Sequence, residues 1–326
     1  MRAGIITVLV ACTYLQTMAQ EKDKSMQSFG KAITDKFPTT RTFDVQYEQL
    51  TPTNFDSELF GKDFERGRID QHNRLKVAFN MPFYVSDSKR FILTASLRYK
   101  YETYGFDEIN NAITSTAYTR ETHDFHLFTT AISATYVSSL FKKPVIYNAT
   151  VSVDGNQENV QRVKGFATAT LVLKKTANTT ITIGAMAILD PSSIIPLTPL
   201  FTYNHKFENS KWDIDFILPQ RLLFRREILE NGRISVGTEL NSESFYLHLN
   251  GENLKGIYEM NQLELKSGLT YEYRITPKVI TFFKGGVNNV LFSRITERGQ
   301  RTNRYVYDHK EETQGYFRVG ISYNPF

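Results

Sequence analysis

A period of two in the apolar residues runs through most of this chain from about residue 42 onward. Successive side chains of a β-strand point to opposite faces, so this period indicates strands with one apolar and one polar face. It is seen most clearly in six segments: 43–48, 75–83, 91–102, 145–154, 262–274 and 317–323. The pattern predicts an all-β fold and leaves little room for helices.

The polar face of these segments carries charges in mid-strand. Arg98, Lys100 and Glu102 lie in one segment, and Glu264 and Lys266 lie in another. A closed apolar core could not accept these groups, whereas a water-filled lumen could. The strands are also longer than the usual five or six residues of soluble sheets, and they match the roughly 9 to 11 residues of a tilted membrane strand. We therefore expect the apolar face to meet lipid, with tyrosines near the strand ends.

Short and long connectors alternate along the chain, as in a barrel with tight turns at one rim and longer loops at the other. The long, polar connectors are expected over residues 51–73, 105–122, 155–162 and 295–313. Residues 212–228 form either two strands hinged at Pro219 or one bent strand. These features predict a transmembrane up-and-down antiparallel β-barrel of about fourteen strands, with twelve as the alternative count.

The first 19 residues are typical of a secretory signal peptide: a positive start, an apolar run and a small residue, Ala19, before the expected cleavage site. Lipidation of Cys12 is the alternative. Residues 20–41 are expected to be a periplasmic leader or a short plug helix, because apolar residues recur there at spacings of three and four. Residues 42–326 are assigned to the barrel.

Composition excludes several classes. The net charge of +5 is small and is not gathered into basic blocks, so no nucleic-acid partner is expected. One Cys cannot form a disulfide framework. After the N-terminal segment, no apolar stretch is long enough for a membrane-spanning helix.

The mature chain resembles Gram-negative outer-membrane β-barrel proteins, in particular functionally uncharacterised porin-like families. The resemblance rests on the alternating strands of residues 42–326 and on the C-terminal aromatic strand that ends at Phe326. It implies an outer-membrane location, contact with outer-membrane lipid and insertion by the barrel assembly machinery. Phe326 departs from the expected pattern because it is out of phase with Phe317, Val319 and Ile321.

Three functions are compatible with such a barrel. The first is a passive channel or transporter for a small solute, lined by Arg98, Lys100, Glu102, Glu264, Lys266 and Glu272. The second is a closed barrel with a structural role, or one that displays loops 105–122 and 295–313 for binding; ion pairs would then fill its interior. The third is an outer-membrane lipid hydrolase that uses His126 and Ser133.

The sequence favours a protein that is not an enzyme. His123 and His126 are three residues apart and would point to opposite faces of a strand, which weakens the hydrolase hypothesis. The six histidines lack the spacing of a zinc site, and no glycine-rich phosphate loop is present. Neither a catalytic residue, a metal nor a cofactor is therefore expected.

Overall fold

The computed structural model describes residues 41–325 except 115, 119–120, 191, 194–195 and 252–253. The predicted signal peptide with Cys12, the predicted leader up to residue 40 and Phe326 lie outside the described residues. No helix in the described part of the chain is long and apolar enough to cross a membrane.

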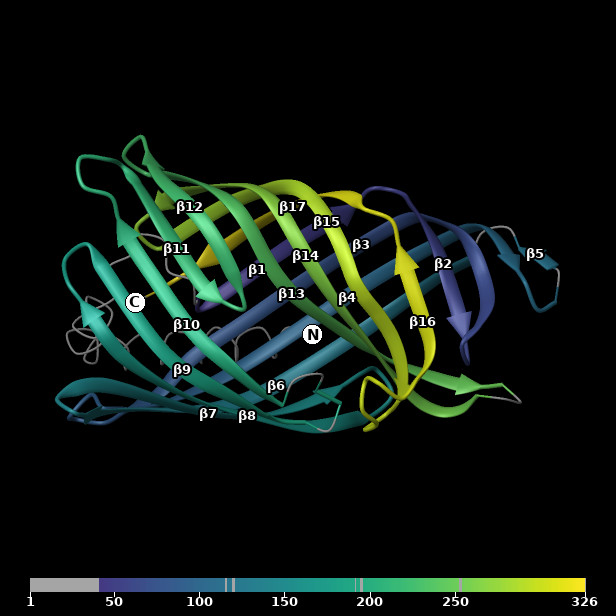
Figure 1. Cartoon of the computed structure of the whole chain (residues 1–326), viewed down its shortest axis with the longest axis horizontal. Coiled ribbons are helices and arrows are strands. Elements are labelled where there is room, and N and C mark those ends of the chain that lie inside the picture. The colour runs from purple at the N-terminus through teal and green to yellow at the C-terminus, as the bar shows by residue number, and fades with distance from the viewer. Residues whose placement is uncertain are drawn as a thin grey trace, which may run out of the picture.

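Within residues 41–325, the described part of the chain forms seventeen antiparallel strands in one sheet (Figure 1). They are β1 (Phe43–Leu50), β2 (Thr53–Leu59), β3 (Lys62–Val85), β4 (Phe91–Asn111), β5 (Thr116–Tyr118), β6 (Glu121–Leu140), β7 (Lys143–Gly155), β8 (Val160–Lys175), β9 (Thr179–Leu189), β10 (Leu197–Lys206), β11 (Trp212–Leu218), β12 (Arg221–Ile228), β13 (Gly232–Asn250), β14 (Lys255–Thr276), β15 (Val279–Glu297), β16 (Tyr305–Glu311) and β17 (Gln314–Tyr323).

The sheet closes into a barrel, because β1 pairs with β17 from Phe43 opposite Tyr323 to Leu50 opposite Tyr316. Three wall strands are interrupted: β1 and β2 both pair with β3, β5 and β6 both pair with β4, and β16 and β17 both pair with β15. Pro52 lies in the first interruption and cannot donate a backbone hydrogen bond. Counted as one strand per pair, the seventeen elements form the predicted ring of fourteen.

The predicted hinge at Pro219 is confirmed. β11 ends at Leu218 and β12 begins at Arg221, and the two strands pair from Ile217 opposite Arg221 to Trp212 opposite Arg226. The region therefore holds two strands, which gives the count of fourteen and excludes the alternative of twelve.

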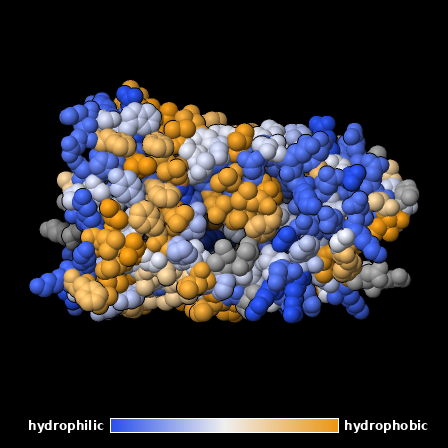
Figure 2. All heavy atoms as spheres, viewed as in Figure 1, coloured by the Kyte–Doolittle hydropathy of each residue, from blue (hydrophilic) through white to orange (hydrophobic). Residues whose placement is uncertain are grey.

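The barrel is apolar outside and polar inside, the reverse of a soluble protein. Large apolar side chains with exposed outer faces include Leu97 (54 %), Ile132 (58 %) and Leu269 (46 %). Tyrosines gather near the short-turn rim on the same face: Tyr84, Tyr136, Tyr147, Tyr273 and Tyr323. Figure 2 shows the apolar residues over the left and middle of the barrel, and mainly hydrophilic residues over its right end. This is the arrangement of a transmembrane barrel.

The wall is much taller on one side than on the other. β3, β4, β13 and β14 have 24, 21, 19 and 22 residues, whereas β11 and β12 have 7 and 8. The tall strands extend at the right end of Figure 1, here called the tall rim, opposite the short-turn rim.

The prediction of long loops at the tall rim is wrong for residues 51–73 and 105–122, and for most of 295–313. β2 and the first half of β3 occupy the first of these segments, β4 runs to Asn111 in the second, and β16 lies in the third. These strand extensions rise beyond the apolar band. Their outer faces are polar, so the alternation that identifies a membrane strand is lost although the strands continue.

Candidate functional site: the barrel lumen

A network of buried charges fills one side of the lumen, along β1, β3, β4, β14 and β17. Arg74, Glu102, Glu264 and Lys266 are fully buried, and Glu48 is 2 % exposed. With β15 between β14 and β17, these strands follow one another in the ring, and alternation turns their polar side chains inward. Charges buried this deeply are stable only when they are paired, as these are.

Arg74 is the centre of this network. Its guanidinium contacts three carboxylates: Nη1 lies 2.7 Å from Glu264 and 3.1 Å from Glu48, and Nε donates to Glu102. Lys266 Nζ also lies 2.5 Å from Glu48 Oε1 and 3.1 Å from Glu264 Oε2. The five charges therefore form one connected cluster.

The network continues around the lumen in two directions. Glu102 accepts hydrogen bonds from Tyr104 (3.1 Å) and pairs with Lys100 Nζ (3.0 Å). Lys100 also reaches Glu243 Oε2 on β13, 3.2 Å away. Since β4 and β13 stand on nearly opposite walls of the ring, this ion pair spans the lumen.

An apolar cluster lies next to the charges on the tall-rim side. It consists of Phe55, Ile69, Tyr104, Ile109, Phe245 and Met260, with Phe125 packed against it. Phe245 of β13 stacks on Phe125 of β6 with 3.9 Å between ring centroids. This contact divides the lumen at this level, because β6 and β13 are on opposite sides of the ring.

The upper part of the β13–β14 hairpin is buried on both faces. Phe245 and Met260 face the apolar cluster, whereas their neighbours Tyr246 and Glu259 are also buried, at 4 % and 0 % exposure. Glu259 pairs with two cations of β8 on the far wall, Arg162 Nη1 at 2.5 Å and Lys164 Nζ at 2.7 Å. Consecutive buried residues mean that this hairpin crosses the mouth of the barrel, between the β3–β4 wall and the β8 wall.

Nearer the short-turn rim than Arg162 and Lys164, the other side of the lumen, along β6 to β10, carries many small uncharged polar side chains. Ser133 Oγ and Thr150 Oγ1 lie 2.7 Å apart, and Asn148 donates to Thr135 Oγ1 at 2.9 Å. The pairing registers turn further threonines to the same face: Thr129, Thr168, Thr170, Thr182 and Thr202. The lumen therefore has a charged, filled side and a threonine-lined side.

The six lumen candidates from the sequence fall into three groups. Lys100, Glu102, Glu264 and Lys266 lie together in the charge network. Glu272 is buried nearer the short-turn rim, where it pairs with Arg41 and Arg233 at 2.6 Å each. Arg98 shares the inner face of β4 with Lys100 but is exposed, and it has no ion pair with a described residue.

Three central residues escaped sequence reasoning. Glu48 was visible on the polar face of segment 43–48. Arg74 directly precedes segment 75–83 and shares a face with Lys76, so extending that strand by one residue would have revealed it. Glu243 lies in a strand without clear apolar alternation, and no local signal marks it.

The structure contradicts the hydrolase arrangement. His126 and Ser133 are on opposite faces of β6, because they are separated by an odd number of residues in a regular strand. His126 Nδ1 contacts Tyr99 Oη at 2.9 Å on the outer face, while Ser133 bonds to Thr150 in the lumen. Asp124 accepts hydrogen bonds from Tyr101 and Thr103.

Comparisons with known proteins give one family and several distant structures. A family model described as "Domain of unknown function (DUF6268)" matches residues 70–324. No curated protein sequence matches the chain. An outer membrane channel from Pseudomonas putida F1 is 12 % identical, with a TM-score of 0.37 over 87 % of this chain and 96 % of that one. The transport unit of an autotransporter from Escherichia coli is 9 % identical, with a TM-score of 0.35 over 89 % and 93 %.

Proposed function

The chain belongs to the family described as domain of unknown function DUF6268, and we propose that it is an integral outer-membrane barrel that lets small polar solutes pass along the threonine-lined side of its lumen. The membrane location is supported by the outer surface. Exposed Leu, Ile, Val and Phe side chains would be costly in water, whereas lipid accepts them. The expected signal peptide is consistent with this location.

The division of the lumen is the observation that carries the proposed passage. The charged side is filled by paired, fully buried groups such as Arg74 and Lys266, and it leaves no room for a solute. Threonine and serine hydroxyls on the β6–β10 side can exchange hydrogen bonds with water or with a hydroxylated solute. A passage lined by such groups would be narrow and only weakly selective for charge.

Among the six lumen candidates, Arg98 alone has no ion pair with a described residue. It lies on β4, next in the ring to β6, and it is exposed on the inner face. An exposed guanidinium inside a lumen favours anions over cations. We therefore propose a slight anion preference for the passage.

Planar-bilayer recording on the purified full chain tests this function. The expected result is a small, steady conductance with a reversal potential shifted toward anions in a salt gradient. Insertion is checked separately by the change in gel mobility on heating, which folded barrels show. A folded and inserted protein that conducts nothing would overturn the proposed passage.

A closed barrel with a binding role is the second candidate, and it is favoured by the hairpin across the mouth. Phe245 packs on Phe125 of β6 and Glu259 pairs with Arg162 of β8, so both residues hold the hairpin against the wall opposite its own strands. Under this alternative, the wild type is silent in bilayers, and conductance appears only when the hairpin is released. The double variant Phe245→Ala/Glu259→Ala distinguishes the two functions, because a passage that is already open would show a conductance before the change.

A further inference from the structure

The barrel wall has a notch at the tip of the β11–β12 hairpin. The last hydrogen bond between this hairpin and β13 runs from the Leu240 amide to the Gln220 carbonyl, at 2.8 Å. β13 continues to Asn250 without a β12 partner, and β10 pairs with β11 only from Phe201 to Lys206. Between Phe201 and Leu197, β10 has β9 alone as its neighbour.

The notch lies at the height of the apolar band. Leu197 and Leu189, on the wall beside it, are 64 % and 69 % exposed. Leu197 is four residues beyond Phe201, which is about 13 Å along a strand. The barrel wall therefore has a gap between β10 and β13, next to side chains that would face lipid.

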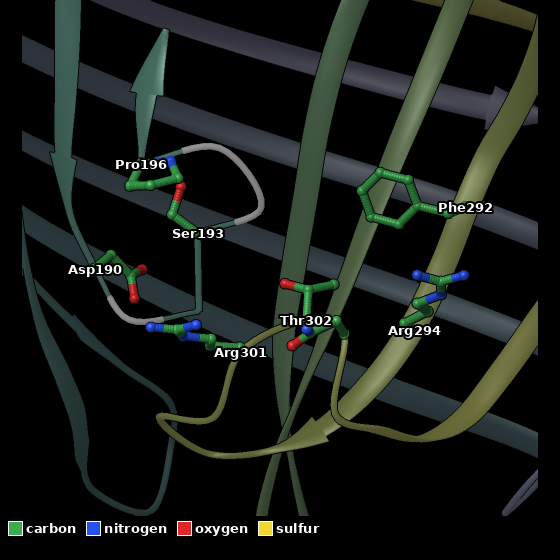
Figure 3. A pocket seen from close by; sticks show the side chains of 8 residues that line it. Asp190, Ser193, Pro196, Phe292, Arg294, Arg301 and Thr302 are labelled. Carbon is green, nitrogen blue, oxygen red and sulfur yellow. The ribbon is translucent and has the colours of Figure 1, made fainter.

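A cavity of about 410 Å³ lies next to the notch. One side is the β9–β10 connection, with Ser193 and Pro196, and the other is β15, with Phe292 and Arg294 (Figure 3). A β-bulge between Val290 and Phe292 reverses the alternation of β15, so Phe292 points away from the charge network and toward this cavity. The volume falls in the range of small-molecule sites.

The lining has an apolar part and a cationic part. Phe292 and Pro196 supply the apolar surface, and Arg294 and Arg301 supply the charge. Asp190 is already paired with Arg162, and Arg294 with Asp308 at 2.9 Å. Arg301 is exposed and has no ion pair with a described residue, so the cavity presents an uncompensated positive charge.

The loop that carries Arg301 is fixed in place. Thr302 is 5 % exposed, and its hydroxyl donates to the Ser192 carbonyl at 2.6 Å. Arg298 Nη1 also donates to Gln161 Oε1 at 3.0 Å. The backbone that carries Arg301 is therefore anchored on both sides of this residue, beside the cavity.

From this arrangement we propose that the cavity binds a single-chain alkyl carboxylate, which enters sideways from the lipid through the notch. The alkyl chain contacts Phe292 and Pro196, and the carboxylate pairs with Arg301. A two-chain lipid would not fit a cavity of this size. The inference rests on the proposed membrane location but not on the proposed solute passage.

Binding of radiolabelled hexadecanoate to the purified full chain in maltoside detergent tests the site. Arg301→Glu is expected to weaken binding about tenfold, because a charge-assisted pair is replaced by repulsion. Ser193→Trp fills the cavity and should abolish binding. The matched controls are Arg304→Glu in the same loop and Ser210→Trp in a turn at the opposite rim, and both should bind as the wild type does.

The head group and the route are tested separately. Hexadecyltrimethylammonium has the same chain and a positive head, and it should not compete with hexadecanoate. A diazirine-bearing hexadecanoate in lipid nanodiscs should label residues 189–200 and 241–250, which flank the notch. Unchanged binding in Arg301→Glu and Ser193→Trp, or equal competition by the cationic amphiphile, would overturn the site; labelling that spares both segments would overturn the lateral route.

These readouts do not depend on ion conductance. A silent barrel that binds hexadecanoate would refute the solute passage and leave this inference intact. A conducting barrel that binds no hexadecanoate would support the solute passage and refute this inference.

Discussion

Phe125 and Phe245 stack with 3.9 Å between their ring centroids, although their strands stand on opposite sides of the barrel. Such a contact cannot form across a lumen that is open over its full width. The β13–β14 hairpin therefore folds inward and contacts the β6 wall above the charge network.

Phe245→Ala should therefore loosen the mouth of the barrel. Removing a buried phenylalanine costs about 3 kcal/mol or more of folding free energy. Denaturant unfolding in micelles should show this loss, and bilayer recordings should show a larger conductance than in the wild type. Phe60→Ala, an exposed phenylalanine at the tall rim, is the control. Equal conductance in the wild type and Phe245→Ala would contradict the role of the hairpin.

Arg74→Ala should be one of the most destabilising substitutions in the lumen. It leaves Glu48, Glu102 and Glu264 with one cation fewer, and an uncompensated buried charge costs about 3 to 5 kcal/mol. Arg98→Ala is the matched control, since this arginine faces the same lumen without an ion pair to a described residue; its effect should be within about 0.5 kcal/mol. The same unfolding measurement compares the two, and similar losses would be inconsistent with Arg74 as the centre of the network.

Leu269→Lys should impair membrane insertion. Leu269 is 46 % exposed on the outer face of β14, and a lysine there costs about 2 to 4 kcal/mol near the middle of a bilayer. Ile113→Lys is the control, because Ile113 is equally apolar and 59 % exposed but lies in a turn at the tall rim. Insertion into lipid vesicles, followed by heat-modifiable gel mobility, should fall for the first variant only. Efficient insertion of both would argue against the lipid-facing assignment.

Arg98→Glu should change ion preference with little effect on stability. Replacing an exposed lumenal cation by an anion should move the reversal potential toward cations in a salt gradient. Lys142→Glu, in the exposed β6–β7 turn, should not produce this shift. An unchanged reversal potential in Arg98→Glu would place Arg98 outside the passage.

Much of the wall could be predicted from the sequence. Alternation of period two reports local backbone geometry and burial on one face, so segments such as 91–102 and 317–323 are visible without tertiary information. Placing a loop at Pro219 keeps long and short connectors alternating along the chain, and this alternation gave the correct number of strands. Where β3 and β4 rise beyond the apolar band, this signal disappears, and the strand extensions were mistaken for loops.

The interior was harder to predict, because its contacts join residues that are far apart in the chain. Lys100 and Glu243 are 143 residues apart, and nothing in either local sequence indicates that they meet. The inward fold of the β13–β14 hairpin was hard to predict for the same reason. Its two buried faces depend on partners in β6 and β8, so the sequence of the hairpin alone looks like an ordinary strand pair.

The threonine-lined passage is the central claim, and single-channel recording of two neighbouring substitutions tests it most directly. Thr170 faces the lumen and Leu171 faces outward on the same strand. A small conductance in the wild type that is lost in Thr170→Trp and retained in Leu171→Trp is the predicted result. A wild-type conductance that survives Thr170→Trp unchanged, or a folded and inserted wild type that never conducts, would contradict the passage.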